Sequence, residues 1–237
     1  KVTYGTGSSV MVNIGENAAK APAGMVTSVG FAALGKIFYA FEGNIHCTGA
    51  TIAWLERELK LINNASEIEE LATSVPDNGG VYFIPAFAGL GAPWWNSRVR
   101  ARIVGMTLGT GKAHVCRAAL ESIVYQITDL VESMTSEAGI CLKELRVDGG
   151  PTRNRFLMRF QSDLLGVPVV RAETEDASAY GAFVMNGFAR KKWQTFEDAA
   201  AIRVSDAPVV PGNGRVAAKQ AYLGWREAVE ELIRSKK

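Results

Sequence analysis

A short strand that turns through two glycines into a helix places the strongest constraint on the fold of this chain. Residues 145–147 alternate apolar and polar, as a strand does, and apolar residues then recur at helical spacing from Phe156. Gly149 and Gly150 separate the two patterns, and Pro151 suits the first turn of a helix. Such a turn exposes backbone N–H groups and the positive end of a helix dipole, which predicts a nucleotide site. An ordinary turn that needs glycine for its dihedrals is the alternative.

Composition excludes several classes of protein. The chain has 237 residues, 48% of them hydrophobic, which is normal for a packed globular protein. Its 26 Lys and Arg against 24 Asp and Glu leave a formal charge of +2, too balanced to indicate binding to nucleic acid or to an acidic membrane. No apolar run approaches the roughly 18 residues of a membrane span. His46 and His114 are the only histidines, which excludes a histidine-rich metal site.

The cysteines and the first residues indicate where the protein works. Cys47, Cys116 and Cys141 are scattered and form no CxxC pair, which is typical of free thiols in a reducing cytosol. The chain opens on Lys1 in strand-like sequence, without a signal peptide or an initiator methionine. We therefore expect a cytoplasmic location and a fragment of a longer protein.

A second glycine turn lies near the beginning of the chain. A β pattern breaks at Gly5, Thr6 and Gly7 and resumes through Ile14, which predicts a hairpin. The two glycines expose backbone N–H groups and Thr6 adds a hydroxyl donor, so this turn could face a phosphate. A tight turn built from small residues is the alternative interpretation.

The remaining pattern predicts one α/β domain. Strands are expected over 26–29 and 36–41, followed by a helix over 43–61 that includes Ile45 and Leu59 on its apolar face. Gly49 within that helix costs about 1 kcal/mol relative to Ala, and close packing of another element or of a ligand would compensate. Antiparallel strands followed by strand–helix alternation predict helices over a mixed sheet.

The second half of the chain has strands, long helices and one unusual loop. A strand is expected over 81–85, and the Gly- and Pro-rich loop after it carries Trp94 and Trp95, which would anchor the loop or contact the edge of a substrate cleft. A long amphipathic helix is predicted over 113–138. A strand is then expected over 168–171. The helix that starts at Ala177 is so rich in small residues that it must pack closely. A connection over 189–212 and a final helix over 217–234 complete the pattern.

Several colinear segments together resemble the C-terminal half of the FGGY carbohydrate kinases. They are Thr3–Gly7, Pro85–Trp95, Gly105–Glu121, Arg146–Gly150, Phe156–Asp163 and Ala179–Ala182. The Gly-Leu-Gly-Ala-Pro-Trp-Trp run within the second segment is more similar to the glycerol kinases than to the pentulose kinases of this family. The resemblance implies an actin-like ATPase (ribonuclease H-like) fold of two lobes with ATP between them. Residues 1–237 would be the C-terminal, nucleotide-binding lobe, without the N-terminal lobe.

The resemblance also implies roles for individual residues. The cofactor-binding set would be Gly5, Thr6, Gly7, Gly49, Gly149, Gly150 and Asn154. Thr6 would contact the phosphates, Gly49 would line the nucleotide pocket, and Gly150 with Asn154 would hold the adenosine. Close packing at 179–182 would seat the adjoining helix. Ala53 stands where glycerol kinases usually have Gln, so one polar contact to ATP would be lost or replaced.

The expected chemistry is phosphoryl transfer with ATP and Mg²⁺. The family's general-base aspartate would lie upstream of Lys1 and the polyol would be held mainly by the first lobe, so no catalytic residue is expected in this chain. We therefore predict that the intact protein phosphorylates a terminal hydroxyl of glycerol or a related polyol and that this chain alone is inactive. A homo-oligomer is compatible with the sequence. The alternatives are a xylulose or ribulose kinase, a non-catalytic nucleotide-binding module, and glycine turns that serve packing alone.

Overall fold

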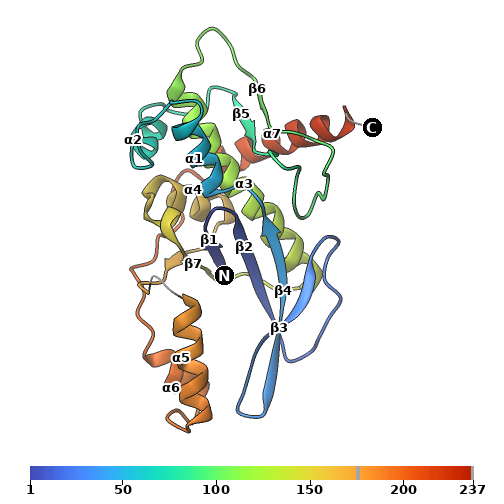
Figure 1. Ribbon diagram of the computed structural model, residues 1–237, viewed down its shortest axis with the longest axis vertical. Helices are drawn as coiled ribbons and strands as arrows, with labels where there is room; N and C mark the ends of the chain where they lie inside the picture. The colour runs from blue at the N-terminus through green and yellow to red at the C-terminus, as the bar shows by residue number, and fades with distance from the viewer. Residues whose placement is uncertain (175–176, 236–237) are drawn as a thin grey trace.

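The computed structural model describes residues 1–174 and 177–235 and has a six-stranded mixed sheet at its centre. The sheet has the order β3-β4-β2-β1-β7-β8 (Figure 1). Its strands are β1 Val2–Tyr4, β2 Ser8–Gly15, β3 Val26–Ala33, β4 Lys36–Ile45, β7 Leu145–Asp148 and β8 Val169–Arg171. A separate antiparallel pair consists of β5 Tyr82–Ile84 and β6 Arg102–Val104. The helices are α1 Gly49–Arg57, α2 Glu67–Thr73, α3 Lys112–Ala138, the 3-10 helix η1 Gly150–Arg153, α4 Arg155–Leu165, α5 Ala177–Ala189, α6 Phe196–Ala201 and α7 Arg215–Arg234.

The sheet changes from antiparallel to parallel at β1. This strand pairs antiparallel with β2 on one side and parallel with β7 on the other, so Val2 lies opposite both Val10 and Val147. The antiparallel part follows from the hairpins in the first 45 residues, and the parallel part requires the long helical crossover that α3 supplies. The predicted mixed sheet with antiparallel N-terminal strands is therefore confirmed. Because β1 and β7 are parallel neighbours, the chain leaves both strands at the same edge of the sheet.

Helix α3 forms the centre of the hydrophobic core. It ends at Ala138, as predicted, and Gly139 follows it with the left-handed φ of 62° that is common just after a helix. The helix packs closely on β4, because a Cβ added at Gly43 would lie 2.9 Å from Leu130 and 3.0 Å from Met134. Trp225 of α7, which is fully buried, contacts the ring of Tyr125 on α3. Helices α3 and α7 therefore support the edge of the sheet at which the chain leaves β1 and β7, where the glycine turns lie.

The helix predicted over 43–61 begins later than expected. Ile45 is the last residue of β4 and pairs with Ser8, and α1 begins at Gly49. Leu59 lies beyond the end of α1 and is 42% exposed. Pairing with β2 extends β4 as far as Ile45. The backbone N–H groups at the start of α1 bond to carbonyls of the turn at Gly5–Gly7. These tertiary contacts override the helical periodicity of residues 43–48.

The close packing predicted for the helix from Ala177 is wrong. Ala182 is exposed, and a Cβ added at Gly181 would meet no atom within 4 Å. Helices α5 and α6 form a small second cluster at the far end of β3, away from the main core (Figure 1). Only Gly187 is used for close approach, since the ring of Trp193 would lie 1.7 Å from its Cβ. The predicted connection over 189–212 also contains α6, which a Thr195–Asp198 capping box starts.

Among residues 1–174 and 177–235, no helix is both long enough and apolar enough to cross a membrane.

Candidate functional site: two glycine turns and an adjacent cavity

The turn at Gly5–Gly7 caps the first helix. The carbonyl of Gly5 accepts a hydrogen bond from the N–H of Gly49 at 2.9 Å, and the carbonyl of Thr6 accepts from the N–H groups of Thr48 at 3.0 Å and Ala50 at 2.9 Å. The hydroxyl of buried Thr48 also donates to the Gly5 carbonyl at 3.0 Å. The start of α1 is therefore satisfied by protein carbonyls, and its N–H groups are not the free anion site that a helix N-terminus can provide.

The same bonds explain why position 49 is glycine. A Cβ on Gly49 would lie 2.6 Å from the carbonyl oxygen of Gly5. On the other side of the turn, a Cβ on Gly7 would lie 2.4 Å from the carbonyl oxygen of Ile45. The N–H groups of Thr6 and Gly7 have no hydrogen-bond acceptor among residues 1–174 and 177–235. These two N–H groups are therefore available as donors, and Thr6 is exposed.

The second glycine turn lies directly against the first. Gly149 has a left-handed φ of 97°, and a Cβ there would lie 1.9 Å from the carbonyl oxygen of Tyr4, the residue before Gly5. Tyr4 is itself fixed, because its buried hydroxyl donates to Oε1 of Gln161 at 3.2 Å. Burial raises the pKa of the Tyr4 phenol far above its usual range, so this group stays protonated as a donor. Two turns that are 140 residues apart in the sequence thus meet at one edge of the sheet.

A cavity of about 520 Å³ opens beside the two turns. It has three walls: one face of α1, the start of α2 with the residues before it, and η1 with the start of α4. Its lining residues are Gly49, Ile52, Ala53, Glu56, Ala65, Ser66, Glu69, Gly150, Pro151, Arg153 and Asn154. Three of the predicted site residues, Gly49, Gly150 and Asn154, therefore line one cavity, whereas Gly5, Thr6, Gly7 and Gly149 lie behind or beside it.

Asn154 is the N-cap residue of α4 and also lines this cavity. Its side-chain oxygen accepts a hydrogen bond from the N–H of Leu157 at 2.8 Å and so caps α4. The amide nitrogen remains as the group that can donate to a ligand. Pro151 lies in η1, so the helix predicted to begin there starts four residues later, at Arg155.

The polar residues of two walls, Glu56, Ser66 and Glu69, were not among the predicted site residues. Glu56 follows Gly49, Ile52 and Ala53 at helical spacing, so a helix that begins at Gly49 would have placed all four on one face. Ser66 and Glu69 reach the cavity from the start of α2, a part of the chain for which no site residue was predicted. No local pattern connects α2 with residues 150–154, because the contact between them is purely tertiary.

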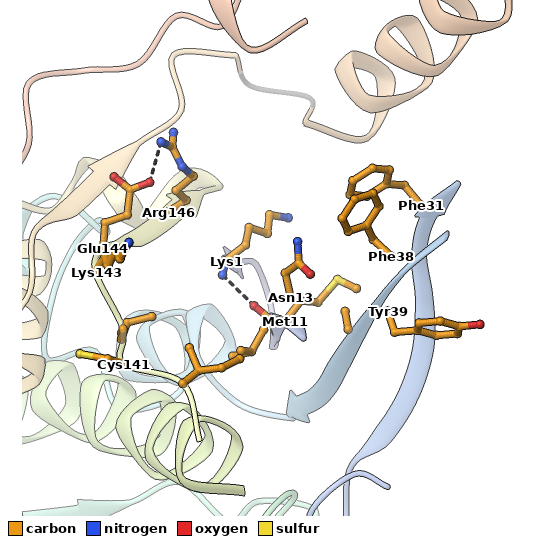
Figure 2. A pocket seen from close by; sticks show the side chains of 15 residues that line it. Lys1, Met11, Asn13, Phe31, Phe38, Tyr39, Cys141, Lys143, Glu144 and Arg146 are labelled. Carbon is orange, nitrogen blue, oxygen red and sulfur yellow. Dashed lines mark hydrogen bonds and ion pairs between the residues drawn. The ribbon is translucent and has the colours of Figure 1, made fainter. Parts of the chain in front are cut away.

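Two neighbouring cavities contain few of the predicted residues. A polar cavity of about 450 Å³ lies on the other side of the second turn, where Gly149, Gly150 and Arg171 line it. Another of about 450 Å³ lies on the sheet face around Lys1, with the stacked rings of Phe31 and Phe38 at one end and the Glu144–Arg146 ion pair at the other (Figure 2). None of the predicted site residues lines the cavity of Figure 2.

The two tryptophans of the Gly- and Pro-rich loop differ in their surroundings. Trp94 anchors the loop, because its ring nitrogen donates to buried Asp129 on α3 at 3.0 Å and Arg226 of α7 lies over its ring. Trp95 is 56% exposed and lies beside His46. Burial raises the pKa of Asp129 to about 6, against the opposing effect of its hydrogen bonds from Tyr222 and Trp94. The anchoring interpretation is confirmed for Trp94.

Comparison with known families decides the identity of this arrangement. Residues 1–190 match the model of the FGGY family of carbohydrate kinases, C-terminal domain. The chain belongs to the FGGY family. The match includes both glycine turns and all three walls of the cavity.

Individual relatives show which members of the family are most similar. The chain is 46% identical over 233 residues to glycerol kinase 2 of Thermotoga maritima, which covers 98% of this chain and 47% of that protein. It is also 46% identical to the glycerol kinase of Petrotoga mobilis over 97% of this chain and 46% of that protein. The chain thus spans about half the length of the curated relatives it matches.

Solved structures confirm the predicted actin-like ATPase fold. The structure of Plasmodium falciparum glycerol kinase with ADP matches 98% of this chain and 46% of that chain, with a TM-score of 0.90 and 35% sequence identity. A ligand-bound xylulose kinase from Lactobacillus acidophilus has the same fold, with a TM-score of 0.87 over 99% of this chain and 47% of that chain, at 18% identity.

Proposed function

We propose that this chain is the nucleotide-binding lobe of an ATP-dependent kinase that phosphorylates a terminal hydroxyl of glycerol or a related polyol. The observation that carries the proposal is the meeting of the two glycine turns beside the 520 Å³ cavity. The relatives support glycerol as the acceptor, since glycerol kinases are 42–46% identical to the chain. The xylulose kinases are only 18–21% identical, so the pentulose alternative is less favoured.

The proposed nucleotide pose follows from the donors on each side. The cavity would hold the adenosine against Gly49 and Gly150, with the Asn154 amide nitrogen as a donor to it. The phosphates would leave the cavity towards the first turn, where the N–H groups of Thr6 and Gly7 and the Thr6 hydroxyl are donors. Phosphoryl transfer depends largely on such positioning and on stabilising charge on the phosphates. Gly5 and Gly149 would contribute by allowing the close approach of the backbone.

The described residues do not by themselves supply a site for Mg²⁺. Within residues 1–174 and 177–235, no group of three or more His, Cys, Asp or Glu side chains could hold a metal ion. The proposed Mg²⁺ would therefore enter with the nucleotide phosphates. The general-base aspartate and the polyol contacts are likewise proposed to belong to the part of the protein that precedes Lys1. Cys47, Cys116 and Cys141 are free thiols, which supports a reducing, cytoplasmic location.

Two measurements test the proposal. ADP titrated into the purified chain should bind, and Thr6→Val should weaken binding because it removes the hydroxyl donor and keeps the shape. The longer protein should transfer phosphate from ATP to glycerol in a panel that includes xylulose and ribulose, whereas the chain alone should not. Phosphorylation of a pentulose in preference to glycerol would favour the alternative substrate. Binding without turnover of any acceptor by the longer protein would instead indicate a regulatory module.

A further inference from the structure

A buried ion pair lies behind the cavity, on α3. The guanidinium of Arg117 donates through Nε to the Glu121 carboxylate at 2.8 Å, and the Arg117 and Glu121 side chains are 15% and 3% exposed. Asn78 and Tyr125 donate to the second oxygen of Glu121 at 2.9 and 3.1 Å. Glu121 therefore accepts hydrogen bonds from three side chains and holds Arg117 in one orientation.

From this position Arg117 contacts α2 and α4, the helices that carry two of the three walls of the cavity, although its partners do not line the cavity. Its Nη1 donates to the carbonyl of Ala72 in α2 at 3.2 Å and to that of Val75 just beyond α2 at 2.7 Å. Its guanidinium also lies over the ring of Phe156, the second residue of α4, at 5.0 Å. Arg117 does not line the cavity itself. It joins α2 and α4 from behind.

A direct contact between the same two walls completes the arrangement. The carboxylate of Glu69, which lines the cavity from α2, accepts a hydrogen bond from the N–H of Arg155 at the start of α4 at 3.1 Å. This single bond is exposed, whereas Arg117 makes two part-buried hydrogen bonds to carbonyls at the end of α2 and also lies over the ring of Phe156. One guanidinium thus links α2 to α4 through more contacts than the Glu69–Arg155 bond does.

We propose that Arg117, oriented by Glu121, is a positioning residue that fixes α2 against α4 and so sets nucleotide affinity without contacting the nucleotide. The proposal rests on the proposed function, since it assigns the cavity to the adenosine. Arginine is required because its planar fork serves the carboxylate, two carbonyls and an aromatic face together. A lysine could keep the ion pair with Glu121 but could not serve the other partners.

The variant Arg117→Lys separates positioning from folding, because it keeps the charge beside Glu121. We expect the Kd for ADP to rise about tenfold, equivalent to ~1.4 kcal/mol, while the variant remains folded. Backbone amides of residues 63–75 should exchange with solvent faster than in the unchanged chain, because α2 loses its bonds to α3. The matched control is Tyr222→Phe in α7. It removes a buried hydrogen bond to Asp129, which lies on α3 as Arg117 does, but it touches neither α2 nor α4.

The outcomes distinguish the two proposals. An unchanged Kd for a folded Arg117→Lys chain, or the same loss in Tyr222→Phe, would overturn the positioning role. If the unchanged chain binds no ADP, the proposed function fails, and amide exchange in residues 63–75 then decides the positioning role by itself. Faster exchange in Arg117→Lys alone would support it, and equal exchange in both variants would refute it.

Discussion

Replacing Gly49 by alanine tests whether the first helix and the first turn form one unit. In an ordinary helix this substitution stabilises a protein by up to ~1 kcal/mol, because glycine has the more flexible unfolded chain. Here the new Cβ would lie 2.6 Å from the Gly5 carbonyl oxygen, where ordinary contact begins near 3.4 Å. Relief requires the turn to move away from α1, which strains the three hydrogen bonds from Thr48, Gly49 and Ala50 to its carbonyls.

The magnitude follows from two opposing effects. Overpacking of this kind costs about 1–3 kcal/mol, and the helix gains at most ~1 kcal/mol, so Gly49→Ala should destabilise the chain by about 1–2 kcal/mol. For a chain of this length that corresponds to a fall in Tm of roughly 2–8 °C. ADP affinity should fall as well, since the displaced turn carries the Thr6 and Gly7 donors.

Gly181→Ala is the matched control for this experiment. Gly181 also lies in a helix, but a Cβ there would meet no atom within 4 Å. It should stabilise the chain slightly or leave it unchanged, and it should not affect ADP binding. Urea denaturation of both variants, with ADP titration of each, gives the comparison. If Gly49→Ala stabilised the chain as much as Gly181→Ala does, the inferred contact between turn and helix would be refuted.

Three further predictions follow from the same structure. Gly149→Ala combines a left-handed φ with a Cβ 1.9 Å from the Tyr4 oxygen, so it should lower the free energy of unfolding by about 2–5 kcal/mol in urea denaturation; a loss below ~1 kcal/mol would contradict this. The raised pKa of Asp129 means that the folded state holds its proton more tightly than the unfolded state, so the free energy of unfolding should fall by ~2 kcal/mol from about pH 4 to pH 6. Asp129→Asn should flatten that dependence, and an unchanged pH profile would rule out Asp129 as its source. Trp94→Phe leaves a buried oxygen of Asp129 without its donor and should cost about 1–3 kcal/mol, whereas Trp95→Phe at the exposed neighbour should cost less than ~1 kcal/mol by thermal denaturation.

Local patterns were enough to predict most elements of the fold. The alternation at 145–147 and the helical spacing after Phe156 correspond to β7 and α4, and α3 ends at Ala138 as predicted. These signals succeed because each depends on neighbours in the sequence. The start of α1 was misplaced because it depends on carbonyls contributed by Gly5 and Thr6, more than 40 residues away.

The tight packing inferred for residues 177–183 failed for a related reason. Small residues permit close approach, but they do not require it, and of the two glycines in α5, Gly187 has a ring against it and Gly181 has no atom within 4 Å. The polar residues that line the cavity could not be predicted either, because tertiary contacts bring them there. Glu69 enters the cavity because Arg117 and Arg155 hold α2 beside α4, and no spacing in the sequence records that contact.

The glycines show why packing and binding cannot be separated at this site. Each glycine turn had two interpretations, a close packing device or a place for a ligand. At Gly49 and Gly149 the packing is real, since a Cβ would strike a backbone oxygen in both cases. The carbonyls of the first turn bond to α1, whereas the N–H groups of Thr6 and Gly7 have no acceptor among residues 1–174 and 177–235. The backbone segment that packs against α1 is thus the same segment that carries the free donors, so a substitution that disturbs the packing should also disturb the proposed phosphate contacts.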